Sequence, residues 1–206
     1  MWSILLYYLL AVVHAASFDS RGLPKGVTIV PLFMDVQAFP DGPMLQLNGT
    51  LKEMHKEILE INPNYLADFN LTVPNRTTLA PREDSYSWIG CHIICGQTYG
   101  TYPKIALGDD ITYINWHPGR PHLQPGPNVC SRVACEYGAS IFVCNDTPVI
   151  RILEGWMSVE NGFWTIWRAC IGDSEVNLSG GQAFHPTGWN VIIYGPGGYI
   201  PSLQVC

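Results

Sequence analysis

The cysteines constrain this chain more than any other feature. All seven lie in the second part of the sequence and none falls in residues 16–90 (Cys91, Cys95, Cys130, Cys135, Cys144, Cys170 and Cys206). Irregular spacing of this kind predicts a disulfide framework in an exported protein. Zinc is the alternative, because Cys91-x3-Cys95 and Cys130-x4-Cys135 loosely resemble ligand pairs. We expect disulfides with one thiol left over, and neither a metal nor another cofactor.

The amino-terminal segment predicts export. Residues 1–13 are almost wholly apolar, and Val13 and Ala15 place small side chains at positions −3 and −1 of a cleavage site. This pattern predicts a signal peptide over residues 1–15. A stretch of about 13 residues is shorter than the roughly 20 residues that cross a bilayer as a helix. We therefore expect a secreted, extracellular protein.

Composition and charge limit the class of partner. Of 206 residues, 47% are hydrophobic, enough for one core or for a core with a small satellite. With a net charge of −6, the chain has no excess of positive charge that would attract nucleic acid or anionic lipid. We expect a monomer that binds an extracellular protein or cell-surface target, with no nucleic acid and with membrane contact only through that target.

Five Asn-x-Ser/Thr sequons accompany the predicted signal peptide, which fits a eukaryotic secretory route with glycans on surface turns. Asn145 is the least favourable of them, because Cys144 precedes it and Pro148 follows the sequon. The predicted glycosylation sites are Asn48, Asn70, Asn75, Asn145 and Asn177.

The cysteine-free part, residues 24–80, predicts a small β-β-α unit. Strands are expected over 27–38, broken by Pro31, and over 45–47, with turn chemistry at 40–43 between them. Thr50 and Glu53 form a capping box before a helix that ends at 62–63. Its predicted apolar stripe is Leu51, Met54, Ile58 and Ile61. The polar run 72–84 is expected to be a linker or exposed loop.

The cysteine-rich part, residues 81–206, alternates predicted strands and helices. Strands are expected over 88–95, 133–144 and 189–194, and helices over 105–114 and 159–170, while the Pro/Gly-rich run 118–127 is expected to be a loop. This order predicts an α+β fold, a two-layer α/β sandwich with a mainly antiparallel sheet, helices on one face and disulfide staples.

Part of this second region resembles known secreted proteins. The segment 126–146 holds Cys130-x4-Cys135-x8-Cys144 and continues Asn145-Asp146, and Gly180–Phe184 and Asn190–Ile193 follow downstream. These motifs resemble a signature of small secreted cysteine-rich proteins of filamentous fungi. The layout is also similar to the killer-toxin fold of killer protein four, a viral toxin of smut fungi. The resemblance covers about residues 86–206.

The toxin resemblance implies a disulfide pairing. It pairs Cys135 with Cys206, Cys95 with Cys170, and Cys130 with Cys144. Cys91 is then the odd thiol, although an exchange of Cys91 with Cys95 is also open.

The toxin resemblance also implies a mode of action, from which this chain departs. Toxins of that type are basic and act on ion channels through positive side chains, whereas this chain is acidic. Arg132 stands near the corresponding basic position, offset by one residue, and is the residue that the resemblance places on a functional surface. The target can therefore differ altogether.

No recognisable catalytic motif is present, so a non-enzymatic effector or killer-toxin-like protein is the main hypothesis. One alternative is a small secreted ribonuclease-like hydrolase that uses Glu136, His185 and Arg132 as carboxylate, imidazole and phosphate binder. Another is a structural protein of the fungal surface. His117 and His122, separated by four residues in the loop, are read as solvated side chains in preference to a metal pair.

Overall fold

The computed structural model describes residues 23–24, 26–72, 88–96, 99–102, 108, 111, 114, 116–136, 138–171 and 178–195. The predicted signal peptide and the run 73–84 of the predicted linker lie outside these residues, as do Asn75, Asn177 and Cys206.

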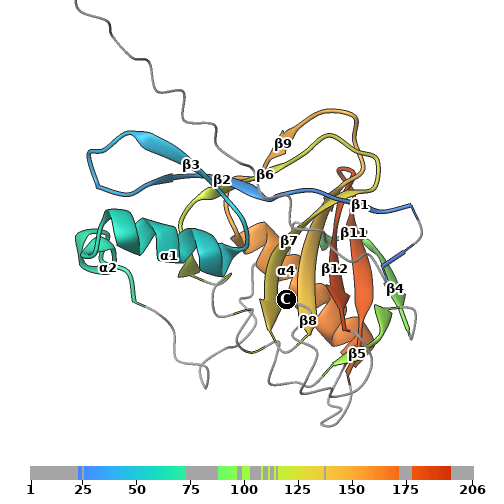
Figure 1. Ribbon diagram of the computed structural model, residues 1–206. Helices are drawn as coiled ribbons and strands as arrows, with labels where there is room; N and C mark the ends of the chain where they lie inside the picture. Colours follow the sequence, from blue (N-terminus) through green and yellow to red (C-terminus); the bar gives the residue numbers. More distant parts are fainter. Residues whose placement is uncertain are drawn as a thin grey trace, which may run out of the picture.

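The largest sheet has six strands in the order β1-β7-β8-β12-β11-β4 (Figure 1). Strand β1 runs parallel to β7, and every other neighbouring pair is antiparallel. The central strand β8 is buried along its whole length, as expected for an apolar run between two neighbours. The strands are β1 (Thr28–Ile29), β4 (His92–Cys95), β7 (Val129–Glu136), β8 (Ala139–Asn145), β11 (Gly181–His185) and β12 (Trp189–Tyr194).

A second sheet has four strands in the order β3-β2-β6-β9, and a third pairs β5 with β10. All of these pairs are antiparallel. The strands are β2 (Phe33–Gln37), β3 (Met44–Asn48), β5 (Thr101–Tyr102), β6 (Arg120–Leu123), β9 (Arg151–Ile152) and β10 (Leu178–Ser179).

Helix α1 (Leu51–Ile61) begins at the predicted capping box. Thr50 Oγ1 accepts from the backbone N–H of Glu53, and Glu53 Oε2 accepts from the backbone N–H of Thr50 at 2.7 Å. Leu51, Met54 and Ile58 are buried as predicted. Ile61, expected in the same stripe, is 41% exposed instead, because the helix ends there and the chain turns into α2 (Tyr65–Asp68).

Helix α4 (Met157–Ile166) packs against β11 and β12 and continues into a π-helical segment, η4 (Trp167–Ile171). Gly162 lets this helix approach closely, since a Cβ there would lie 2.5 Å from Trp88 Cζ2 and 2.7 Å from Val191 Cγ2. The expected helix near 105–114 lies largely outside the described residues. The described residues in and just after this range, Gly108, Ile111, Ile114 and Trp116, are helical.

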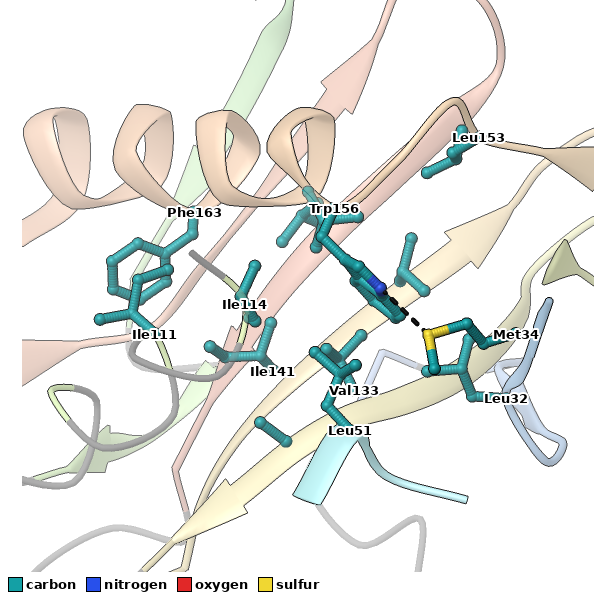
Figure 2. Close-up of a cluster of buried hydrophobic side chains, with 14 of the residues drawn as sticks. Leu32, Met34, Leu51, Ile111, Ile114, Val133, Ile141, Leu153, Trp156 and Phe163 are labelled. Carbon is teal, nitrogen blue, oxygen red and sulfur yellow. Dashed lines mark hydrogen bonds between the residues drawn. The ribbon is translucent and has the colours of Figure 1, made fainter. Parts of the chain in front are cut away.

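One hydrophobic core unites the two predicted parts. Strand β2 pairs with β6, and β1 pairs with β7, so both large sheets contain strands from each side of residue 80. Trp156 at the start of α4 directs its Nε1 to Met34 Sδ on β2 at 3.3 Å (Figure 2). The described residues of 24–80 therefore share one buried cluster with those of 81–206.

Two local expectations are wrong. The run 118–127 is not wholly a loop, because Arg120–Leu123 form β6 between β2 and β9. Pro121 lacks an N–H for the ladder, and the β6–β9 pairing covers only the next two residues. The expected single strand 133–144 is a hairpin of β7 and β8, and Gly138 provides the positive φ of 81° at its turn.

The structure therefore has the predicted α+β class, with mixed helices and sheets and two described disulfides.

Candidate binding surface

The three residues of the ribonuclease hypothesis do not converge. Glu136 pairs across the sheet with Ala139, at one end of β8, and His185 pairs with Trp189, which lies opposite Asn145 at the other end. From residue 139 to residue 145 is six strand steps, about 20 Å at about 3.4 Å per residue. Glu136 forms an ion pair with Lys52, and His185 stacks on the Trp189 ring with centroids 4.9 Å apart. No general acid–base pair results.

Arg132, the residue that the toxin resemblance places on a functional surface, is only partly exposed. It is half-buried on β7, and its guanidinium carbon lies 5.8 Å from the centroid of the Phe142 ring. Burial lowers the pKa of Arg132, and the nearby Glu53 carboxylate opposes that shift. The side chain is thus held against the sheet.

The two loop histidines are buried, which corrects the expectation of solvated side chains. His122 is 6% exposed on β6, and its Nε2 donates to Asp35 Oδ2 at 2.8 Å. His117 is 5% exposed, and its Nδ1 donates to the carbonyl of Pro118 at 2.6 Å. The two imidazoles have different partners and do not form a metal pair. Among the described residues, no group of three or more His, Cys, Asp or Glu side chains could hold a metal ion.

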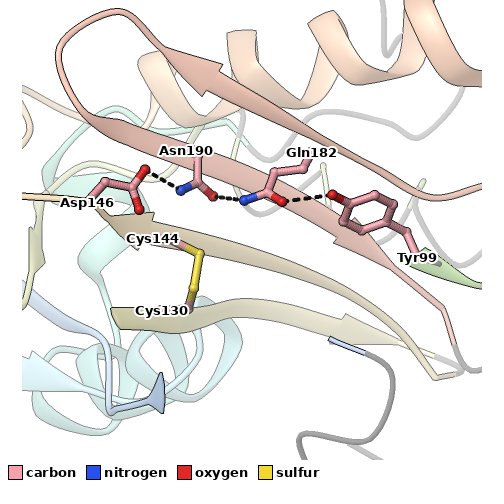
Figure 3. The surroundings of a disulfide bond; sticks show 6 residues. All are labelled: Tyr99, Cys130, Cys144, Asp146, Gln182 and Asn190. Atoms are coloured by element: carbon pink, nitrogen blue, oxygen red, sulfur yellow. Dashed lines mark hydrogen bonds between the residues drawn. A yellow bond between two sulfur atoms is a disulfide. The ribbon is translucent and has the colours of Figure 1, made fainter. Parts of the chain in front are cut away.

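Two disulfides fasten the six-stranded sheet. Cys95 on the edge strand β4 is bonded to Cys170 in η4, and this bond ties the helix to the sheet. Cys130 and Cys144 face each other across β7 and β8 (Figure 3). These are two of the pairs that the toxin resemblance implied.

The two other described cysteines, Cys135 and Cys91, differ in their bonding. Cys135 is also disulfide-bonded, but its partner and Cys206 lie outside the described residues, so the Cys135–Cys206 pairing stays a prediction. Cys91 is the free thiol among the described cysteines, and burial raises its pKa.

A row of polar side chains crosses the sheet face that carries the Cys130–Cys144 disulfide (Figure 3). Tyr99 Oη donates to Gln182 Oε1 at 2.8 Å, Gln182 Nε2 donates to Asn190 Oδ1 at 2.9 Å, and Asn190 Nδ2 donates to Asp146 Oδ2 at 2.8 Å. Every donor points toward the Asp146 carboxylate, so the bonds polarise one another in one direction. Tyr99 is 4% exposed, so the row begins inside the protein.

The described sequons divide by exposure. Asn48 at the end of β3 and Asn70 after α2 are exposed. Asn145 is fully buried; its Nδ2 donates to the carbonyl of Val149 at 2.7 Å, and its Oδ1 accepts from the backbone N–H of Thr147 at 2.9 Å. The predicted glycan at Asn145 is therefore incompatible with the folded structure.

Five large apolar side chains are exposed on segments that meet at one end of the six-stranded sheet. We call this group the apolar end. Its members lie just before β4, around β9 and at the start of α4; they are Ile89 (70% exposed), Val149 (63%), Ile150 (49%), Ile152 (42%) and Met157 (45%).

Contacts between these segments hold the apolar end together. Trp88 Nε1 donates to the carbonyl of Ser158 at 2.9 Å, which joins the segment before β4 to the first turn of α4. Arg151 on β9 donates to Thr187 in the turn between β11 and β12. Figure 1 shows β9 and this turn at the same end of the molecule. The Trp88 and His185 rings pack edge to face with centroids 5.0 Å apart.

Sequence reasoning missed the apolar end. The run 149–153 is apolar apart from Arg151, which is equally typical of a buried strand. In the fold, Val149 and Ile150 precede β9 and Ile152 lies on β9 at the edge of the four-stranded sheet, and these three side chains are exposed, whereas Leu153 is buried. Exposed apolar groups that form a contiguous patch mark interaction sites.

No protein-family model, characterised protein or solved structure matches this chain. Within the described residues, no helix is long and apolar enough to cross a membrane.

Proposed function

We propose that this protein is a secreted, non-catalytic effector or killer-toxin-like protein that binds an extracellular protein or cell-surface target through the apolar end. The apolar end carries the proposal, because its five exposed apolar side chains lie on segments that are linked through the Trp88–Ser158 and Arg151–Thr187 hydrogen bonds and the Trp88–His185 ring contact. Aromatic and aliphatic side chains with a polar rim are typical of protein-binding surfaces.

The scaffold beneath this surface favours binding with little rearrangement. The Cys95–Cys170 bond holds the helical segment against the edge strand, and the Trp88 indole hydrogen-bonds the start of α4. A pre-organised surface loses less conformational entropy when it binds. The disulfides also fit an oxidising compartment, which supports the proposed secretion.

The killer-toxin part of the proposal rests on the arrangement of the helix, the strands and the disulfides. In that layout, α4 over β11 and β12 would be one layer of a two-layer sandwich whose disulfides include Cys95–Cys170 and Cys130–Cys144. The net charge of −6 and the half-buried Arg132 favour recognition through apolar groups over channel block by a positive side chain.

The test is cell binding by purified, fluorescently labelled protein on fungal and plant cells. The Val149→Ser/Ile150→Ser variant is expected to lose 10-fold or more in affinity, since truncating central apolar contacts costs more than about 1.4 kcal/mol at a hot spot. Met44→Ser is the matched control, because Met44 is a similarly exposed apolar residue (55%) on β3 at the opposite edge of the four-stranded sheet.

Equal binding by both variants and the unaltered protein would exclude the apolar end as the binding surface. The ribonuclease alternative predicts RNA cleavage that His185→Ala abolishes. Recovery of the protein in the insoluble cell-wall fraction would favour the structural surface protein.

A further inference from the structure

Four aromatic rings pack together beside α1 and α2, away from the apolar end. The His55 ring on α1 lies at the centre of this group, with ring centroids 5.1 Å from Trp116, 5.4 Å from His117 and 6.4 Å from Tyr65. Tyr65 is on α2, and Trp116 and His117 belong to the segment before β6. We call this group the ring cluster. It joins the helical segment to the chain that leads into the four-stranded sheet.

The ring cluster is poorly suited to a positive charge. Tyr65 is 0% exposed, His117 5% and His55 9%. His117 Nδ1 already donates to the carbonyl of Pro118, so a second proton would go to Nε2, which is buried and has no hydrogen-bond acceptor among the described residues. An added proton would therefore bring an uncompensated charge into a desolvated site.

Among the described residues, no carboxylate offsets such a charge. The charged side chains of α1 and α2 are exposed to solvent; they are Lys52, Glu53, Lys56, Glu57, Glu60 and Asp68. The ionisable side chains in the cluster itself are His55, His117 and Tyr65, and burial raises the pKa of Tyr65 to about 12, so it stays neutral. The two imidazoles also repel each other when both are charged.

We propose that the ring cluster is an acid-sensitive joint: protonation of its imidazoles releases α1 and α2 from the segment before β6, while the six-stranded sheet stays folded. This device is independent of the proposed target and of the apolar end.

The direction and the magnitude of the pH effect on opening follow from the linkage between proton binding and opening. Burial lowers the pKa of His117 from 6.5 to about 4, and burial also lowers the pKa of His55. Because the folded-state pKa is depressed, the open state takes up the proton first. The stabilising contribution is complete above pH 6.5 and is lost as the pH falls from 6.5 toward 4. For His117 alone, the open population rises roughly 20-fold between pH 7 and pH 5 and roughly 100-fold by pH 4.

The test is amide hydrogen exchange on the full chain between pH 7 and pH 4, corrected for the intrinsic pH dependence of exchange. We expect the protection of α1 and α2 amides to fall by these factors, while β8 and β12 amides keep theirs. His117→Gln should remove most of the change, whether or not the variant is less stable. His92→Gln is the matched control, since His92 is exposed on β4.

A direct titration of His117 by NMR in the unaltered protein covers the case in which His117→Gln does not fold. A His117 pKa near 4 supports the proposal, and one above 6 overturns it. Equal loss of protection in the helices and the sheet overturns it too, because that result means global unfolding. A pH response of undiminished size in His117→Gln also overturns the proposal, because His117 would then contribute nothing to it.

Discussion

Gly162→Ala sets helix propensity against packing, and the structure predicts which effect is larger. In the interior of an exposed helix this change stabilises by about 1 kcal/mol, because glycine loses more backbone entropy than alanine. At Gly162 the added Cβ would lie 2.5 Å from Trp88 Cζ2 and 2.7 Å from Val191 Cγ2. Ordinary contacts begin near 3.4 Å, so α4 must move outward by about 1 Å or both neighbours must shift. Overpacking of this kind costs about 1–3 kcal/mol.

The net expectation is a destabilisation of about 0.5–2 kcal/mol, measured as a shift in the urea midpoint with an unchanged m-value. Gly108→Ala is the matched control: Gly108 is also helical, and no atom of the described residues lies within 4 Å of the position that a Cβ would take there, so this variant should gain up to about 1 kcal/mol. Trp88→Leu should partly rescue Gly162→Ala, because it removes the nearest ring atoms. A Gly162→Ala protein as stable as Gly108→Ala would refute the close approach of α4 to Trp88.

A disulfide, a buried hydroxyl and two sequons each give a further prediction. Replacing Cys95 and Cys170 by serine should cost about 4–5 kcal/mol in chemical denaturation, since the bond closes a loop with a sequence separation of 75; a loss under about 1 kcal/mol would contradict this. Tyr99→Phe should cost about 1–3 kcal/mol, because it leaves a buried amide oxygen without its donor, and thermal unfolding measures this. Peptide mapping of the secreted protein should find a glycan at Asn48 and none at Asn145; full occupancy of Asn145 would contradict its burial.

Local signals predicted the elements that depend on near neighbours in sequence. The Thr50–Glu53 capping box located the start of α1, and the expected strand 133–144 overlaps the buried strand β8, although the turn at Gly138 divides that run into two strands. These features are decided within a few residues, so a single sequence contains the information. The placement of Pro121 in a strand is different, because it depends on β2 and β9, which lie far away along the chain.

Burial of polar residues could not be read from the sequence for the same reason. His117 and His122 stand in or beside a Pro/Gly-rich run that is typical of exposed loops, yet one packs against His55 and the other bonds Asp35, each from a distant segment. The residues of the apolar end show the reverse: a run that is typical of a core strand lies at a sheet edge. Candidate sites that combine distant segments therefore need the fold.

The pairing of β1 with β7 restricts the order in which this chain can fold. Thr28 pairs with Val129, 101 residues later, and Met34 pairs with Pro121, 87 residues later. Long sequence separations of this kind slow folding, because loop closure precedes the contacts that stabilise it. At synthesis rates of about 5–20 residues per second, β7 is synthesised roughly 5–20 s after β1. The pairing of β1 with β7 and of β2 with β6 therefore forms only after β6 and β7 have been synthesised, whereas the local hairpin of β2 and β3 does not depend on them.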